Sequence, residues 1–247
     1  HTYKREKDEN MDLIDIHCHI LPGVDDGAKN MDIALALIEK EIEAGVETII
    51  LTPHFRKEMF EPDMEDIWNA YDELLYETRY KNIRLYLGCE FHANMEMVET
   101  LDNDLRPTLA DSRYVLTEFA HNSTRAFMKE RADALLMSGY RPIIAHIERY
   151  RATRKDFDLI EDLIEMGCEV QVNADAIIGR DGLGAQRFCK KLMQEDMLHY
   201  VGSDTHNLRG RAPHLGECCE YLKKHMGRLY TSRIMRDNPS KIVEKAR

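Results

Sequence analysis

The sequence predicts an α/β fold in which parallel strands form a barrel-like sheet covered by helices. Seven short aliphatic or β-branched runs alternate with longer segments whose apolar residues recur at helical spacing, which is typical of repeated βα units. The chain has 247 residues, 43% of them apolar, which is enough for one domain of this kind. Histidine, aspartate and glutamate also gather at the ends of the strand-like runs, where parallel barrels carry their functional residues.

The predicted strands are short runs that end before a helical segment begins. They are residues 13–17 (LIDIH), 46–52 (VETIILT), 83–88 (IRLYLG), 114–119 (YVLTEF), 142–147 (PIIAHI), 168–173 (CEVQVN) and 199–204 (HYVGSD). We expect a single domain over residues 11–247, because no low-complexity segment or Gly/Ser linker divides it. Residues 1–10 show no periodic pattern and Met11 is a natural start, so we interpret residues 1–10 as an N-terminal extension or cloning remnant.

The helices are predicted from amphipathic spacing. In residues 31–45 the apolar side chains of Ile33, Leu37, Ile38 and Ile42 share one face, and Gly45 follows as a helix-ending residue. Further helices are expected at roughly 63–79, 94–101, 124–138, 156–166, 184–196 and 209–226. One more short helix is expected after Tyr230, with Asn238-Pro239 at its start.

Composition excludes several classes of function. The formal net charge of −11 argues against non-specific binding to nucleic acids or acidic membranes, so an anionic substrate would need locally placed cations. The six cysteines form no C-x-x-C pair, and their low density favours the reducing cytoplasm over a disulfide scaffold. No apolar stretch approaches the length of a membrane span, and the polar first residues are unlike a signal peptide, so we expect no membrane insertion.

Residues that bind metals follow six of the seven predicted strands. His17 and His19 should point to the same side of the first strand, because side chains alternate along a strand. The other strand ends add His54, Glu90, Glu118, His146, Asp204 and His206. A lone H-x-H pair or strand-end glutamate is more often structural than a ligand, so only the convergence of all these residues at one edge of the sheet indicates a metal site. There, a cation would offset the cost of burying Glu90 and Glu118.

This ligand set indicates more than one metal ion. Imidazoles combined with carboxylates suit Zn²⁺, Mn²⁺ or Fe²⁺ better than Ca²⁺, and eight candidate ligands are too many for one tetrahedral ion. Two or three metals held close together are typical of phosphoesterases. Arg149 and Arg211 follow the same strand ends and match phosphate oxygens, so we expect them to bind the phosphate. The chain contains no C-x5-R, G-x-x-x-x-G-K-[ST] or G-x-S-x-G motif, which excludes three other kinds of catalytic apparatus.

These residues resemble a known family, the PHP (polymerase and histidinol phosphatase) domains. The closer likeness is to the bacterial manganese-dependent protein tyrosine phosphatases of capsule and exopolysaccharide operons, and it runs from Met11 to about the C-terminus. The motifs that carry it are DIHCHILPGVDDG, TPHF followed by MFEP, GCE, LTEF, AHIERY, and GSDTHN with the following Arg211. The resemblance implies a distorted (β/α)7 TIM-like barrel with a site for three divalent metals.

The resemblance also implies roles for individual residues. The metal ligands would be His17, His19, His54, Glu90, Glu118, His146, Asp204 and His206, with Glu90 and Glu118 as bridges. The catalytic residues would be Arg149, Arg211, Asp26 and His206, with Asp26 an acid/base or a neighbour of the ligands. Mn²⁺ is the expected metal, and Fe²⁺ or Fe³⁺, Zn²⁺, Mg²⁺ and Co²⁺ are alternatives. The implied partner is the phosphotyrosine-containing tail of a bacterial tyrosine kinase that controls polysaccharide export, and a homo-oligomer is an implied assembly.

The leading hypothesis is therefore hydrolysis of protein phosphotyrosine. A small-molecule phosphatase, such as one for histidinol phosphate, is the alternative within the same superfamily. An exonuclease-like PHP module fits poorly with the acidic chain. A metal-stabilised binding protein without turnover is the alternative from a different class, and an Arg149 variant would distinguish it because such a protein has no activity to lose.

Overall fold

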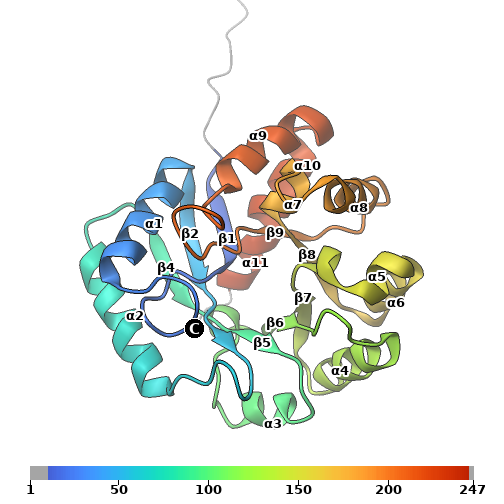
Figure 1. Ribbon diagram of the computed structural model, residues 1–247, viewed down its shortest axis with the longest axis horizontal. Helices are drawn as coiled ribbons and strands as arrows, with labels where there is room; N and C mark the ends of the chain where they lie inside the picture. The colour runs from blue at the N-terminus through green and yellow to red at the C-terminus, as the bar shows by residue number, and fades with distance from the viewer. Residues whose placement is uncertain (1–10, 245–247) are drawn as a thin grey trace, which may run out of the picture.

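Parallel strands occupy the centre of the molecule and helices surround them on the outside (Figure 1). The computed structural model describes residues 11–244, and the predicted N-terminal extension lies outside this range. The strands are β1 Leu13–Cys18, β2 Val46–Leu51, β3 His54–Phe55, β4 Arg84–Leu87, β5 Glu90–His92, β6 Tyr114–Glu118, β7 Arg141–Ile144, β8 Glu169–Asn173 and β9 Tyr200–Gly202. Each of the seven predicted strands is present, and β3 and β5 are short additions that directly follow β2 and β4.

The strands form a curled sheet with one interruption. The order β1-β2-β4 makes one part and β3-β5-β6-β7-β8-β9 makes the other. The chain therefore changes sheets three times, between β2 and β3, between β3 and β4, and between β4 and β5. The two ends of the curl meet where Asp204 N donates to His17 O and His19 N donates to Thr205 O, both at 2.8 Å. The predicted α/β barrel class is confirmed, with the distortion located between β4 and β6.

The first helix shows why a predicted segment folds as it does. Helix α1 (Met31–Glu43) begins at Asn30, whose side chain accepts a hydrogen bond from Ile33 N at 3.0 Å. It ends at Glu43, and Gly45 follows two residues later with a φ of +89°, in the left-handed region that favours glycine. Leu37 and Ile38 are fully buried against the sheet, as their spacing predicted.

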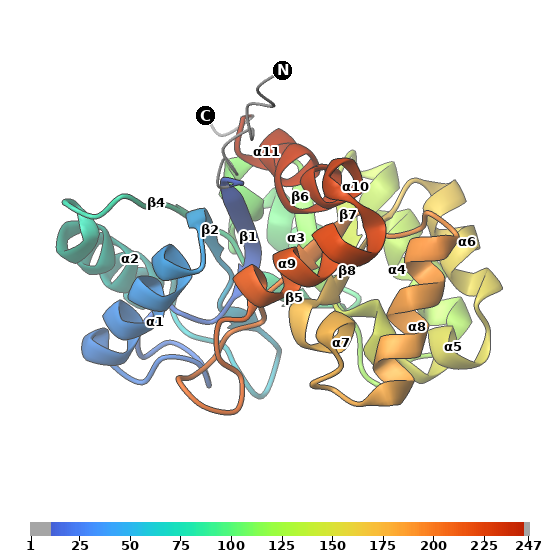
Figure 2. The same ribbon diagram turned by 90° about the horizontal axis from the view of Figure 1, so that it is seen from above.

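The remaining helices cover the outside of the curl, as two perpendicular views show (Figures 1 and 2). They are α2 Met64–Thr78, α3 Met97–Asp102, α4 Arg125–Met137, α5 Arg151–Lys155, α6 Asp158–Met166, α7 Ala174–Ile178, α8 Leu183–Gln194, α9 Leu215–Met226, α10 Arg228–Ser232 and α11 Asn238–Val243. Short 3-10 turns span Leu109–Asp111 and Ile147–Arg149, and a π turn spans Arg233–Asp237. No helix within residues 11–244 combines the length and apolar character that crossing a lipid bilayer requires.

Several predicted boundaries are wrong. The helix predicted at 209–226 begins only at Leu215, because the Asn207 side chain accepts hydrogen bonds from the backbone N–H groups of Arg209 and Gly210 and holds a loop there. The strand predicted at 142–147 ends at Ile144, and the one at 199–204 ends at Gly202. Helices α5, α7 and α10 were not predicted, because five residues are too few to show a period.

Buried side chains form two apolar clusters on either side of the sheet. The smaller cluster joins Ile16 of β1, Ile50 of β2, Leu116 of β6 and Ile143 of β7, so it is enclosed by the strands. The larger cluster joins the strands to the surrounding helices. Many of the buried polar and charged side chains lie at the carboxyl ends of the strands, where the candidate site lies.

Candidate metal centre

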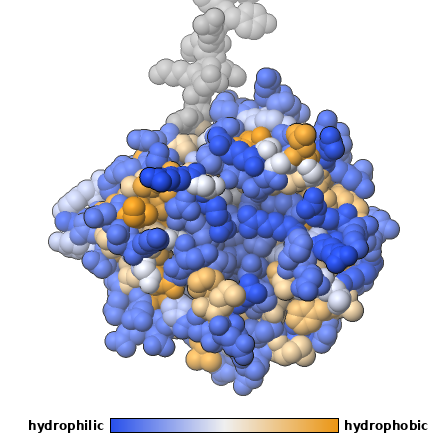
Figure 3. Space-filling model, viewed as in Figure 1, coloured by the Kyte–Doolittle hydropathy of each residue, from blue (hydrophilic) through white to orange (hydrophobic). Residues whose placement is uncertain are grey.

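The eight predicted ligands meet at the carboxyl ends of the strands. His17 lies in β1, His54 in β3, Glu90 in β5 and Glu118 in β6, while His146 follows β7 and Asp204 follows β9. His19 and His206 lie in the segments just beyond β1 and β9. The face that carries these segments is hydrophilic around its centre (Figure 3). The structure therefore brings together every residue that the strand-end pattern selected.

Glu90 is the centre of the site. Its Oε2 atom lies 3.2 Å from His17 Nε2 and 3.1 Å from His19 Nε2. The same atom lies 2.9 Å from His54 Nδ1, and Oε1 lies 2.8 Å from His146 Nε2. The carboxylate is fully buried. Burial alone would raise the pKa of Glu90, but the neighbouring His17 and His54 outweigh it and hold that pKa well below its usual range.

Asp204 makes the second group of contacts. Its Oδ1 lies 3.5 Å from the Nε2 atoms of both His17 and His19. Arg211 donates to Oδ1 at 2.7 Å, Arg149 pairs with Oδ2 at 2.9 Å, and Asn173 Nδ2 donates to Oδ2 at 2.8 Å. Despite burial, the positive charges of His17 and the two arginines hold the pKa of Asp204 well below its usual range. The predicted phosphate-binding arginines thus lie directly beside the ligand cluster.

The candidate ligand atoms form four groups. In each group, all the ligand atoms lie no more than 4.8 Å from one another. The groups are His19, Asp26, His54 and His206; His17, His146 and Asp204; His17, His19 and Glu90; and His54, Glu90 and Glu118. Glu90, His17, His19 and His54 each belong to two groups. A carboxylate that faces two groups at once is suited to bridging two cations.

Unsatisfied polar atoms test whether these residues fit a bound metal. Glu90 Oε2, Glu118 Oε2, His54 Nδ1 and His206 Nε2 are buried and make no hydrogen bond with good geometry to residues 11–244. Each such atom costs about 1–3 kcal/mol when it is left unpaired. Burial, and then the charge of Glu90, raises the pKa of Glu118 to about 7, which shows how poorly two adjacent carboxylates tolerate this position without a cation. The donor set therefore fits divalent metals.

A second layer of side chains orients the imidazoles. Asp25 accepts a hydrogen bond from His19 Nδ1 at 2.7 Å, and the Asp204 carbonyl oxygen accepts one from His206 Nδ1 at 2.9 Å. Gln171 Oε1 lies 3.3 Å from His17 Nδ1. Because each partner is an acceptor, these three Nδ1 atoms carry the protons and the Nε2 lone pairs remain for a metal.

Sequence reasoning missed this second layer. Gln171 and Asn173 lie in β8, the one predicted strand without an assigned ligand, and Gln171 also accepts from His146 N at 2.7 Å. Asp25 was passed over for its neighbour Asp26. The only available signal was the Asp-Asp-Gly sequence, which does not say which carboxylate points inward.

Asp26 lies at the exposed edge of the site. Its Oδ1 is 3.4 Å from His206 Nε2 and 3.6 Å from His54 Nε2, and 47% of its side chain is exposed. The adjacent His206 imidazole lowers the pKa of Asp26. The structure therefore places Asp26 among the possible ligand atoms, next to the predicted catalytic histidine.

Close backbone approaches and unusual backbone angles hold the site together. A Cβ at Gly27 would lie 1.9 Å from His19 O, and a Cβ at Gly202 would lie 2.7 Å from His17 Cβ, so both positions exclude any side chain. His146 and Asp204 have φ values of +30° and +52°. These left-handed turns end β7 and β9 and direct both side chains into the cluster, which is why the two strands are shorter than predicted.

Comparison with known proteins identifies relatives over nearly the whole chain. Residues 13–244 match a family described as "Capsular polysaccharide synthesis, CpsB/CapC". A tyrosine-protein phosphatase CpsB from Streptococcus pneumoniae is 35% identical over 239 residues, which cover 94% of this chain and 98% of that protein. The tyrosine-protein phosphatase YwqE of Bacillus subtilis is 31% identical over 217 residues, which cover 87% of this chain and 85% of that protein.

A solved structure agrees with the sequence comparison. A chain from the crystal structures of YwqE from Bacillus subtilis and CpsB from Streptococcus pneumoniae, described as metal-dependent tyrosine phosphatases, superposes with a TM-score of 0.89. The match covers 95% of this chain and 96% of the other at 28% sequence identity. The fold around the ligand cluster is therefore shared with proteins described as dependent on metal.

Proposed function

The chain belongs to the CpsB/CapC family of capsular polysaccharide synthesis and is a metal-dependent tyrosine-protein phosphatase, and we propose that its substrate is the phosphotyrosine-containing tail of a bacterial tyrosine kinase. We further propose Mn²⁺ as the metal and three ions as their number. The proposed ligands are His17, His19, His54, Glu90, Glu118, His146, Asp204 and His206. Arg149, Arg211, Asp26 and His206 are the proposed catalytic residues.

One observation carries this proposal: three imidazole nitrogens converge within 3.2 Å of Glu90 Oε2, which has no hydrogen bond of good geometry to residues 11–244. A structural ion pair would not gather three imidazoles around one carboxylate oxygen and leave it without a proton donor. A cluster of divalent cations explains the arrangement. Such a cluster lowers the pKa of water to near neutrality and neutralises charge on a transferring phosphoryl group.

The protein's own residues bind and orient the phosphate. Arg149 and Arg211 are partly exposed, with 40% and 37% of their side chains accessible, and both point to Asp204 at the bottom of the site. Their guanidinium groups match the oxygens of a phosphate monoester and stabilise the charge that develops on them. The Asp204 carboxylate pairs with both arginines, and Asn173 donates a hydrogen bond to the same carboxylate. These contacts fix the two guanidinium groups before the substrate arrives.

The reaction consumes one water molecule. The water oxygen bonds to phosphorus in line with the tyrosine oxygen, the bond between phosphorus and that oxygen breaks, and tyrosine and inorganic phosphate are released. The phenol of tyrosine has a pKa of about 10, so its oxygen leaves with less help from an acid than an alkoxide needs. The water proton can be accepted at Asp26 Oδ1, which lies at the entrance beside His206, and then passes to the phenolate oxygen to give tyrosine.

The first test is metal-dependent turnover of a phosphotyrosine peptide. After removal of metals with a chelator, activity is expected to return on addition of Mn²⁺. A variant carrying His17→Ala and His19→Ala is expected to stay inactive and to bind fewer metal ions. We expect this loss of metal because both imidazoles lie within 3.2 Å of Glu90. The metal content of the variant should be measured by elemental analysis.

Other outcomes of this test decide between functions. Turnover of histidinol phosphate far above that of the peptide would favour the small-molecule phosphatase. Stoichiometric metal without turnover of either compound would contradict the phosphatase and leave a metal-stabilised binding protein.

Phe60 is the proposed contact for the tyrosine ring. Its ring stacks on His54 with a centroid distance of 5.1 Å and an interplanar angle of 14°. Paired backbone hydrogen bonds to Arg56, at 2.8 and 2.9 Å, fix it beside the metal ligands. Phe60→Ala is expected to raise KM for a phosphotyrosine peptide about fivefold, because an aromatic contact of this kind contributes about 1 kcal/mol.

The Phe60 prediction has two controls. KM for an alkyl phosphate, such as a phosphoserine peptide, should change much less, and the metal content should be unchanged. Met59→Ala removes an exposed neighbour in the same turn and should alter neither. An equal loss with aryl and alkyl phosphates would show that Phe60 only supports His54.

We propose the cytoplasm as the compartment. All six cysteines are buried free thiols, and burial raises the pKa of several of them, such as Cys89 and Cys168. Free thiols are typical of proteins kept in a reducing environment.

A further inference from the structure

A large pocket lies away from the metal centre, at the place where the sheet is interrupted. Its volume is about 990 Å³, which is in the range of sites for small organic ligands. Strand β4 pairs only with β2, and the next strand in the curl, β6, pairs with β5 instead. Helix α2, strand β4 and the segment 101–113 line the resulting space. Arg113 and Tyr140 border it just before β6 and β7 begin, whereas the metal ligands follow the carboxyl ends of the strands.

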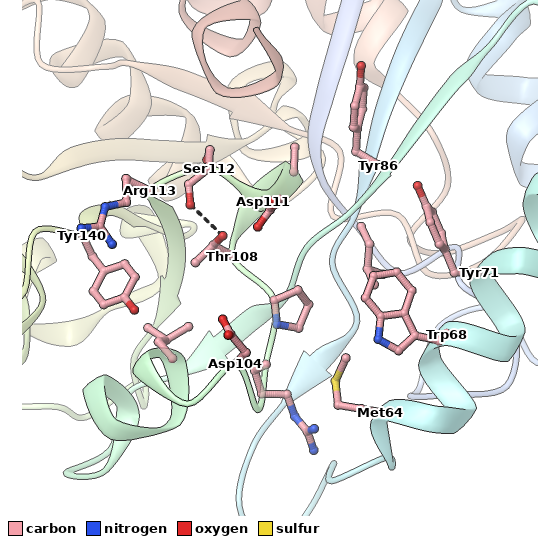
Figure 4. Close-up of a pocket in the computed structure, with 15 residues that line it drawn as sticks. Met64, Trp68, Tyr71, Tyr86, Asp104, Thr108, Asp111, Ser112, Arg113 and Tyr140 are labelled. Atoms are coloured by element: carbon pink, nitrogen blue, oxygen red, sulfur yellow. Dashed lines mark hydrogen bonds between the residues drawn. The ribbon is translucent and has the colours of Figure 1, made fainter. Parts of the chain in front are cut away.

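One wall of this pocket is aromatic. Trp68 and Tyr71 extend from α2, and Tyr86 extends from β4 beside them (Figure 4). The rings of Trp68 and Tyr71 meet edge to face at a centroid distance of 5.9 Å. Trp68 leaves 47% of its side chain exposed, which is unusual for a residue that normally buries most of its large apolar area. The exposed faces of these rings offer a platform for an apolar surface.

The opposite wall is polar. Asp104, Thr108 and Asp111 lie across the pocket from the rings (Figure 4). Asp104 and Asp111 both line the pocket, and their carboxylates make no hydrogen bond or ion pair within residues 11–244. The Arg113 guanidinium lies over the Tyr140 ring, 5.2 Å from its centroid, and makes no side-chain hydrogen bond or ion pair to the residues between 11 and 244. Acceptors and a donor are therefore available to a ligand.

The backbone of the polar wall is held in an uncommon conformation. Among residues 11–244, seven residues other than glycine have positive φ. Two of them, His146 and Asp204, belong to the metal centre, and three line this pocket: Asp104 at +54°, Ala110 at +50° and Asp111 at +52°. Such conformations gather at functional sites, where surrounding structure holds them in place. This clustering supports a binding role for the polar wall.

The chemistry of the two walls selects one class of ligand. The two arginines at the pocket, Arg106 and Arg113, balance its two aspartates, so the pocket favours neither a polyanion nor a polycation. A saccharide ring has an apolar face that can lie on an aromatic ring, and hydroxyl groups that both donate and accept hydrogen bonds. We propose that this pocket is a second ligand site that binds a neutral saccharide, between the rings of Trp68 and Tyr86 and the carboxylates of Asp104 and Asp111.

The proposal goes beyond the phosphatase activity and does not depend on it. A member of a capsular polysaccharide synthesis family would meet saccharides during the process that its family serves. The pocket shares no lining residue with the four groups of candidate ligand atoms, so a saccharide should bind together with inorganic phosphate and without competing with it.

Trp68 supplies a direct test, because it is the only tryptophan in the chain. The intact protein would be titrated with cellobiose, maltotriose, lactose and chitotriose while tryptophan fluorescence is recorded. A saturable change with at least one saccharide is expected. A variant with Asp104→Asn and Asp111→Asn should bind that saccharide at least about tenfold more weakly, the loss expected when charge-assisted hydrogen bonds become neutral ones.

Controls separate this site from the active site and from unfolding. Asp133→Asn, an exposed aspartate on α4, should leave the affinity unchanged. The double variant should keep the melting temperature and the turnover of p-nitrophenyl phosphate. Trp68→Ala, followed by calorimetry instead of fluorescence, should abolish binding.

Three results would overturn the proposal. No response to any of these saccharides at tens of millimolar would exclude the site as a saccharide pocket. A response to aromatic peptides alone would make it a protein-docking surface. A fluorescence change that depends only on protein concentration would make it a contact between copies of this chain. None of these readouts requires phosphatase turnover, so they are independent of the proposed function.

Discussion

Glu90→Gln is expected to lower kcat/KM for a phosphotyrosine peptide by about a thousandfold, equivalent to about 4 kcal/mol of transition-state stabilisation. Glutamine has the size of glutamate but carries no charge, and its amide nitrogen cannot bind a cation. Glu90 is fully buried, and both of its oxygens face imidazole nitrogens at 2.8–3.2 Å. The neutral side chain would therefore leave two groups of ligands without their shared anion.

Metal content provides the decisive measurement for this variant. Elemental analysis should find fewer metal ions per chain in Glu90→Gln than in the wild type. The rise in melting temperature on adding Mn²⁺ to the stripped protein should also be smaller, because a ligand stabilises a protein in proportion to its affinity for the folded state. The melting temperature of the stripped variant should itself fall, since the neighbouring imidazoles stabilise the charged form of Glu90 and the substitution removes that charge.

Glu148→Gln is the matched control. Glu148 is also buried, but its Oε1 accepts a hydrogen bond from Asn173 N at 3.0 Å and it belongs to none of the four groups of ligand atoms. A glutamine oxygen can accept the same hydrogen bond, so metal content should be unchanged and activity should stay within about tenfold. A Glu90→Gln protein with full metal content and wild-type turnover would contradict the assignment of Glu90 as a bridge.

Arg149→Lys and Arg211→Lys are each expected to lower kcat/KM about a hundredfold with metal content unchanged. Removal of one preorganised donor to a developing oxyanion typically costs a factor of about 10²–10³. Lysine retains the positive charge but loses the planar fork that matches two phosphate oxygens. Inorganic phosphate should inhibit both variants more weakly than the wild type, which measures phosphate binding without turnover.

An arginine outside the site controls for general effects of the exchange. Arg180 donates to Glu217 at 2.8 Å and is about half exposed, so Arg180→Lys should leave both kcat and phosphate inhibition unchanged. If the Arg149 and Arg211 variants behaved like this control, the two guanidinium groups would serve only to neutralise Asp204.

Much of the site was predictable because strand geometry is local. Alternation of side chains places His17 and His19 on one side of β1, and parallel pairing brings the carboxyl ends of all strands to one edge. Both rules need only residue types and spacing. That is why the residues now seen together were found in a sequence in which they are spread from His17 to His206.

The local rules failed where long-range contacts set the backbone. His146 and Asp204 were predicted to lie in extended strands, yet both have positive φ, because contacts to distant residues hold their turns. His146 N donates to Gln171, and Asp204 N donates to His17 O across the closure of the sheet. The Asp25 carboxylate accepts hydrogen bonds from His19 Nδ1 and from the backbone N–H of His54, which is 29 residues further along the chain. No spacing rule distinguishes Asp25 from Asp26.

The sequence by itself determined the α/β class, the seven predicted strands and the set of candidate metal ligands, since periodicity and residue type are properties of short segments. Tertiary structure alone decided which carboxylate lies at the centre of the ligands, which side chains orient the imidazoles, and where the sheet is interrupted to leave the pocket beside Trp68. These features depend on pairing between segments far apart in the chain. Such pairing is set by the free energy of packing the whole core, to which no short segment gives access.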